Sequence, residues 1–175
     1  VFGKRAGIAA SEFAGSHGAG PSDAAIIAAE SDRILDYLSD RRTGPRPNVI
    51  KAMLQKLMND HVGVVRNDEG LREAVARFER MEAVDLCTMS VAESNRIGNY
   101  DWIEALEVTA MVRFARAMAG AALKRTESRG AHYREDYPEL DNEAWLKNII
   151  IRKDSDELAF EPRACAPDPT LETAE

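Results

Sequence analysis

The sequence predicts a mainly α-helical fold: an up-down bundle of three to four helices, followed by a polar loop and a C-terminal β-hairpin. Apolar residues recur at helical spacing over most of residues 22–124. Glycine and proline then interrupt this pattern within a polar stretch, Glu127 to Pro138. Two β-prone runs around a polar turn follow, at residues 148–152 and 158–162, and indicate the hairpin.

The composition fits a compact domain with its own core and argues against two classes of partner. A chain of 175 residues, 45% of them hydrophobic, can bury a core. Its net charge of −7 disfavours nucleic acid and anionic membranes. The longest aliphatic run, Ala24–Ala29, is far shorter than the ~20 residues of a membrane span, so no direct membrane insertion is expected. Cys87 and Cys165 lack metal-ligand spacing, so no metal site is expected.

A first helix is expected at the N-terminus, over residues 1–10. Gly3 and Gly7 lie on one face of it and would allow another surface to approach closely. The Gly-, Ser- and Ala-rich residues 15–21 then predict a linker. His17 lies within this linker, where we expect it to be solvated.

Two helices follow, separated by a segment rich in arginine and proline. Ser22 is the expected N-cap of the first, which continues to about Asp40. Residues 41–47 end that helix, and Pro47 suits the first turn of the next one. The apolar stripe of this next helix consists of Ile50, Met53, Leu54, Leu57 and Met58.

The last two helices of the bundle are separated by a polar connection at residues 85–98. Asp68 is the expected cap of the earlier helix. Its predicted core face consists of Leu71, Ala74, Val75, Phe78 and Met81. Asn99 or Asp101 can cap the final helix, which is apolar almost all round from Trp102 to Lys124 and is therefore expected in the middle of the bundle.

The polar loop, Glu127 to Pro138, combines three acids, two arginines, two tyrosines and a histidine. Gly130 and Pro138 prevent it from being helical throughout. A cluster of planar hydrogen-bonding groups directly after a buried helix suggests a site, whereas a solvated surface loop explains the same composition.

The segment Ser128–Pro138, followed by Trp145-Leu146-Lys147, closely resembles the C-terminal signature of succinate dehydrogenase and fumarate reductase flavoprotein subunits. L-aspartate oxidases share part of it. Residues 58–71 are also similar to that family, and residues 1–7 resemble the helix that closes its flavin domain, with Lys4 where arginine is usual. Asn148 stands where the family has a histidine after the tryptophan, which leaves that imidazole's role in doubt.

This resemblance implies the C-terminal part of an FAD-dependent enzyme that oxidises succinate or reduces fumarate and exchanges electrons with an iron-sulfur subunit. Residues 1–20 would then close a flavin domain, 21–127 form the bundle, and 128–175 contain the signature, the hairpin and a disordered tail. Catalytic residues would lie outside this chain, because it contains no Gly-x-Gly-x-x-Gly and matches none of the family's catalytic motifs. The fragment alone is expected to be inactive and to bind no FAD.

The implied partners are the protein's own flavin domain and the iron-sulfur subunit, in the cytoplasm or at a membrane through partner subunits. The polar loop would dock near the domain junction through four residues: Arg129, His132, Arg134 and Asp136. Two alternatives remain open: an L-aspartate oxidase C-terminal domain, and a stand-alone helical interaction module without a flavin.

Overall fold

The computed structural model describes residues 2–18, 20, 23–39, 41–154 and 157–165. The chain divides into two compact units, one ending at Asp36 and the other beginning at Tyr37. The functional division expected at residues 20 and 127 remains a prediction. Within the described residues, no helix is long and apolar enough to cross a membrane.

The first unit contains two helices, α1 (Phe2–His17) and α2 (Ala24–Leu35), and neither buries a residue. α1 continues through residues 15–17, which were expected in the linker. His17 is therefore the exposed last residue of a helix, with its ring stacked 3.9 Å from that of Phe13. Ser22 lies outside the described residues, and Asp23 caps α2 by accepting from the Ala25 N–H at 2.8 Å.

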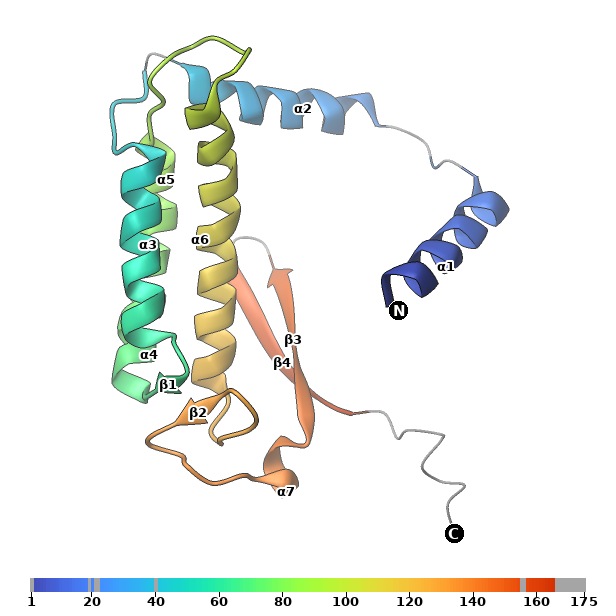
Figure 1. Ribbon diagram of the computed structural model, residues 1–175, viewed down its shortest axis with the longest axis vertical. Helices are drawn as coiled ribbons and strands as arrows, with labels where there is room; N and C mark the ends of the chain where they lie inside the picture. The colour runs from blue at the N-terminus through green and yellow to red at the C-terminus, as the bar shows by residue number, and fades with distance from the viewer. Residues whose placement is uncertain (1, 19, 21–22, 40, 155–156, 166–175) are drawn as a thin grey trace. The chain divides into compact units, whose positions relative to one another are not determined.

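The second unit is built on α3 (Pro47–His61), α4 (Asp68–Arg80) and α6 (Tyr100–Lys124), which run up and down beside one another (Figure 1). A short 3-10 turn, η1 (Asp36–Leu38), precedes them, so α2 ends earlier than the expected Asp40. This arrangement confirms the predicted mainly α bundle.

The N-terminal residues of the bundle helices agree with the sequence predictions, except that the cap of α4 lies one residue earlier. Pro47 begins α3 as predicted, and Asn99 caps α6 through the Trp102 N–H at 3.0 Å. Asn67, and not Asp68, caps α4: its backbone is extended and its side chain accepts from the Gly70 N–H at 2.9 Å. Asp68 is instead the first residue of the helix.

The expected polar connection at residues 85–98 begins with further helical turns. A π-helical segment, η2 (Met81–Asp85), extends α4 and leads into α5 (Leu86–Thr88). The irregular chain after α5 passes Gly44, whose N–H donates to the Thr88 carbonyl at 2.8 Å. A Cβ at Gly44 would lie 2.4 Å from the Thr88 hydroxyl, so this close approach requires glycine.

The core lies between α3, α4 and α6, and most predicted core positions occupy it. Met53 is the exception on α3, because 39% of it remains exposed. Alanines on α6 let the neighbouring helices approach closely. The buried apolar residues of these three helices are Ile50, Leu54, Leu71, Ala74, Phe78, Ala105, Val108, Val112, Ala115, Ala119 and Ala122.

After α6 come β2 (Tyr133–Arg134), the single turn α7 (Asn142–Trp145) and the predicted hairpin, β3 (Lys147–Asp154) and β4 (Glu157–Ala164). β3 and β4 are antiparallel, with Ile151 opposite Phe160. β2 pairs in parallel with β1 (Val65–Arg66), between α3 and α4. The tail predicted to be disordered lies outside the described residues from residue 166 onward.

The hairpin packs against α6 at Gly120 (Figure 1). A Cβ on Gly120 would lie 2.3 Å from the ring of Phe160, so the absence of a side chain makes room for the phenyl group. α6 thus contacts helices on one side and the hairpin on another. We expected the bundle to enclose α6, but it does not: Phe114 is 71% exposed and Met118 is 50% exposed.

Candidate functional site

The backbone of the polar loop is fixed by a tight turn and by one serine. Arg129 and His132 exchange two backbone hydrogen bonds of 2.8 and 3.0 Å around Gly130, which has a φ of +59°. The Ser128 hydroxyl accepts from the Arg134 N–H at 2.9 Å and donates to the Tyr137 carbonyl at 2.8 Å. Gly130 therefore breaks the helical pattern in the way the sequence predicted.

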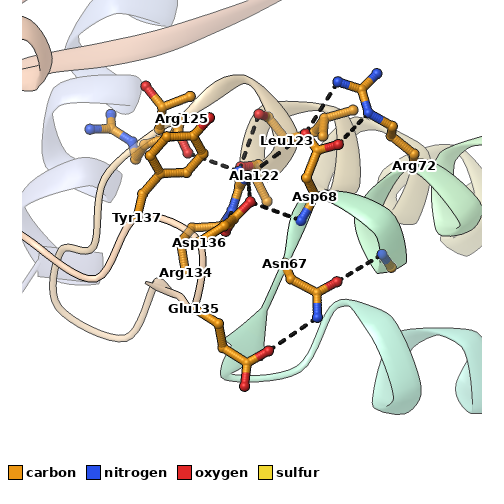
Figure 2. A network of polar contacts seen from close by, with 12 residues as sticks. Asn67, Asp68, Arg72, Ala122, Leu123, Arg125, Arg134, Glu135, Asp136 and Tyr137 are labelled. Atoms are coloured by element: carbon orange, nitrogen blue, oxygen red, sulfur yellow. Dashed lines mark hydrogen bonds and ion pairs between the residues drawn. The ribbon is translucent and has the colours of Figure 1, made fainter.

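Arg134 is completely buried and holds the loop against the end of α6 (Figure 2). Its Nη1 donates to the carbonyls of Ala122, Leu123 and Arg125 at 2.9, 3.2 and 3.1 Å. The last carbonyls of a helix lack partners within that helix, so the guanidinium satisfies groups that would otherwise be costly to bury. The Tyr137 ring lies 5.0 Å from the guanidinium carbon.

The remaining donors of Arg134 bind Asp136, which also contacts α4. Nε and Nη2 donate to the two carboxylate oxygens at 2.8 and 2.6 Å, a bidentate pair. Asp136 also accepts from the Asp68 N–H at 3.0 Å, and Glu135 accepts from the Asn67 amide at 3.1 Å (Figure 2). The hydrogen bond from Arg134 is the main cause that lowers the pKa of Asp136.

Glu127 forms a second buried centre on the hairpin side of the loop. It accepts from Arg129 Nε and Nη2 at 2.7 and 3.0 Å, from the Asp141 N–H at 2.9 Å, and from Arg125. Burial alone would raise the pKa of Glu127. The hydrogen bonds from Arg129, the Asp141 backbone and Arg125 outweigh this and lower the pKa to about 2. The carboxylate is therefore ionised at neutral pH.

Arg125 connects this carboxylate to the start of the hairpin. Its Nη1 donates to the Trp145 carbonyl at 3.1 Å and its Nη2 to the Lys147 carbonyl at 2.6 Å. The guanidinium also lies over the Trp145 ring, 5.2 Å from its centroid. Asn148, at the position of the family histidine, is an exposed β3 residue opposite Arg163.

His132, in the polar loop, faces Arg66, which lies in β1 between α3 and α4. Its Nδ1 lies 2.6 Å from Arg66 Nη1, and arginine can only donate, so Nδ1 accepts and the ring proton resides on Nε2. Among the described residues, Nε2 is the buried side-chain polar atom without a hydrogen-bond partner. Burial first, then the charge of Arg66, lowers the pKa of His132, while the Arg125 backbone partly offsets this. His132 is thus a neutral imidazole.

The side chains of the four residues predicted for the domain junction divide among three contacts. Arg134 pairs with Asp136, Arg129 binds Glu127, and His132 binds Arg66. Three further members were not on that list: Glu127, Arg125 and Arg66. Glu127 could have been found as a carboxylate at the end of an apolar helix between two arginines, and Arg66 through the family-like segment that contains it. Docking through Arg129, His132, Arg134 and Asp136 stays a prediction. The guanidinium of Arg134 is hydrogen-bonded within the chain, to the Ala122 carbonyl and to Asp136.

The chemistry available at the loop is that of anchoring. Its arginines pair with Glu127 and Asp136, Glu135 accepts from the Asn67 amide, the histidine is neutral, and the serine hydroxyl binds backbone. In the part of the chain that the structure describes, no three His, Cys, Asp or Glu side chains gather to hold a metal. A nucleophile beside a base, the minimum for covalent catalysis, is not among these contacts.

The described residues define a class of domain: a helical bundle whose last helix is capped by an arginine-rich loop and packed against a β-hairpin. A family model described as the fumarate reductase flavoprotein C-terminus matches residues 51–170, and the chain belongs to this family.

Curated relatives agree with this assignment. A fumarate reductase flavoprotein subunit of Mycobacterium tuberculosis is 32% identical over 162 residues, which is 89% of this chain and 28% of the relative. An uncharacterized FAD-dependent oxidoreductase of Methanocaldococcus jannaschii is 36% identical over 154 residues, covering 87% of this chain and 26% of its own length. The chain thus spans about a quarter of the length of the curated relatives it matches.

Solved structures share the fold. The Mycobacterium smegmatis Sdh1 complex in its apo form superposes with a TM-score of 0.85 at 27% identity, covering 93% of this chain and 28% of that one. The adenylylsulfate reductase of Archaeoglobus fulgidus superposes with a TM-score of 0.77 at 23% identity, covering 93% of this chain and 28% of its own. At that identity the second likeness concerns the fold alone.

Proposed function

We propose that this chain is the C-terminal part of an FAD-dependent oxidoreductase that oxidises succinate or reduces fumarate. The observation that carries the proposal is the family match over residues 51–170, together with relatives named as fumarate reductase and succinate dehydrogenase flavoprotein subunits. FAD, the dicarboxylate and an iron-sulfur partner subunit would bind to parts of the protein outside this chain.

Within such an enzyme, the chain supports the flavin domain and subunit assembly. Charged groups that are satisfied internally favour this role over catalysis, because Glu127 and Arg134 are fully buried with their partners. The loop keeps a few groups at its surface for docking. The Arg129 side chain is 33% exposed, and Tyr133 and Tyr137 are each about two-fifths exposed.

The activity is tested with the natural gene product purified under non-denaturing conditions. We expect a flavin spectrum and electron transfer from succinate to an artificial acceptor, or from a reduced acceptor to fumarate. Oxidation of L-aspartate without succinate or fumarate turnover would favour the oxidase alternative. A protein without flavin and without either activity would overturn the proposal in favour of a stand-alone helical module. Residues 1–175 alone should show no turnover.

The docking role of the loop is tested with Arg129→Ala in the same protein. We expect weaker FAD retention and impaired subunit assembly. Arg125→Ala is the matched control, because Arg125 is the other arginine bound to Glu127 and is only 15% exposed. Thermal unfolding of both variants separates docking from folding. Unchanged FAD retention, assembly and turnover in Arg129→Ala would refute a docking role for this residue.

A further inference from the structure

The helix α6 presents three sides, and two of them are covered. One side packs into the core against α3 and α4 through Val108, Val112 and Ala115. The second receives the hairpin, where Phe160 lies over Gly120. The polar loop closes its C-terminal end through Arg134. The third side of α6 is left open to solvent over most of its length.

This third side is an apolar row interrupted by Glu107, here called the open stripe. With Glu107 counted, its positions recur in steps of three or four residues, so they share one face of the helix. Ile103, Phe114 and Met118 are 48, 71 and 50% exposed, and the row from Tyr100 to Met118 spans ~27 Å at 1.5 Å per residue. Glu107 is the charged residue among its exposed positions. The open stripe consists of Tyr100, Ile103, Ala110, Met111, Phe114 and Met118.

An aligned row of this kind carries information that single exposed residues do not. Scattered surface hydrophobics are normal, whereas a contiguous apolar patch marks an interaction surface. The exposed faces of α3 and α4 show the contrast, because they carry charges such as Lys56, Asp60 and Arg72. A surface nearly free of charge suits a permanent contact better than a transient one.

We propose that the open stripe is the surface on which the FAD-binding part of a flavoprotein of this family docks. The inference rests on the proposed function and adds to it which surface makes the contact, namely the open stripe of α6. Length supports this occupant: the relatives match nearly all of this chain with only 26–28% of their own residues, so most of each relative lies outside the bundle. The relative from Methanocaldococcus jannaschii is FAD-dependent by its name.

Other occupants fit the surface less well. An anionic membrane is disfavoured because the chain has a net charge of −7 and the stripe contains Glu107. The exposed Arg113 borders the stripe but pairs with Glu82 at 3.4 Å. A second copy of the chain would have to bury two identical stripes against each other, with the two Glu107 side chains brought near one another. Both remain outcomes of the test.

The test uses the natural gene product with a photo-crosslinking phenylalanine analogue at position 114. The matched control carries the analogue at Val49, an apolar residue of α3 that is 48% exposed. After irradiation, peptide mass spectrometry identifies the crosslinked residues. We expect position 114, and not position 49, to crosslink to the FAD-binding part, within the same chain or in a separate one. Crosslinks only to a second copy of this bundle, to lipid, or to nothing would overturn the inference.

A second variant asks whether the contact matters energetically. Phe114→Asp combined with Met118→Asp should release flavin and increase protease cleavage before the bundle, while Val49→Asp should do neither. The bundle itself should keep its helical signal, because both side chains lie largely outside its core. If the wild-type protein contains flavin and the double variant keeps it with unchanged cleavage, this inference fails and the proposed function stands. If the wild-type protein contains no flavin, the proposed function fails as well.

Discussion

Two charged side chains of the polar loop, Arg134 and Glu127, are buried and hold the structure together instead of lying at its surface. Arg134 has every guanidinium nitrogen engaged, in contacts to two α6 carbonyls and to the carbonyl of its C-cap Arg125, and in a bidentate pair with Asp136. Glu127 collects two arginines and a backbone N–H in the same way. Buried charges of this type persist only when they are fully paired, so removing one partner is costly.

Arg134→Ala should therefore destabilise the bundle strongly. The substitution removes the arginine partner of Asp136 and leaves three carbonyls at the end of α6 without their donor. Comparable losses cost roughly 3–5 kcal/mol of unfolding free energy. Urea denaturation followed by circular dichroism measures the change. Arg72→Ala is the control, because its ion pair with Asp68 is exposed and within one helix. Similar midpoints for both variants would contradict the anchoring role of Arg134.

Acid should weaken the loop through Glu127. Its pKa is lowered to about 2 in the folded protein, from 4.5 for an ordinary glutamate. A depressed carboxyl pKa stabilises the folded state above the unfolded value, and this contribution disappears as the pH falls from about 4.5 toward 2. Glu127→Gln should thus be less stable than wild type at neutral pH, with the difference shrinking over that interval. A difference in unfolding free energy independent of pH would contradict this prediction.

The location of the loop could be predicted from sequence, but its burial could not. Gly130 and Pro138 break a helical pattern, and the family-like motif marks the segment. Arginine and glutamate are rarely fully buried, so composition favours solvated side chains for Arg134 and Glu127. Their burial depends on α6 carbonyls and on residues as distant as Asp68, which no local pattern reveals.

At the level of elements, α6 organises the rest of the second unit. α3 and α4 pack on one side, the hairpin on another, and the polar loop on its C-terminal end. Helical periodicity predicted these elements well because each has an apolar stripe. It placed the cap of α4 one residue late, at Asp68, because asparagine and aspartate cap equally well and the extended backbone at Asn67 decides between them. It also overestimated the enclosure of α6, since an apolar surface does not say which contacts cover it.

Gly120→Ala should loosen the hairpin. The new methyl group would lie 2.3 Å from the Phe160 ring, so the ring and the strand that carries it must move away from α6. Hydrogen exchange of the β3 and β4 amides should become faster. Gly7→Ala provides the control, because nothing lies within 4 Å of a Cβ at that position. Restoration of slow exchange by adding Phe160→Ala would support the steric cause, while unchanged exchange in Gly120→Ala would exclude it.

At the level of the whole molecule, the role proposed for the chain is that of a support for the flavin domain. Its own residues provide a helical bundle, an internally paired loop and one uncovered apolar face, and its relatives are about four times as long. The Mycobacterium smegmatis Sdh1 complex and the adenylylsulfate reductase share this fold, and a fold alone does not determine function. The residues that bind the substrate determine substrate specificity. The sequence resemblance predicted the family correctly.

The most direct test of this account is the intact mass of the natural protein, measured together with its visible absorbance in the flavin region. The account predicts a chain substantially heavier than 19.3 kDa that co-purifies with flavin. A natural chain of 19.3 kDa without flavin, alone or in complex, would contradict it and leave a helical module that kept the family's bundle without its chemistry.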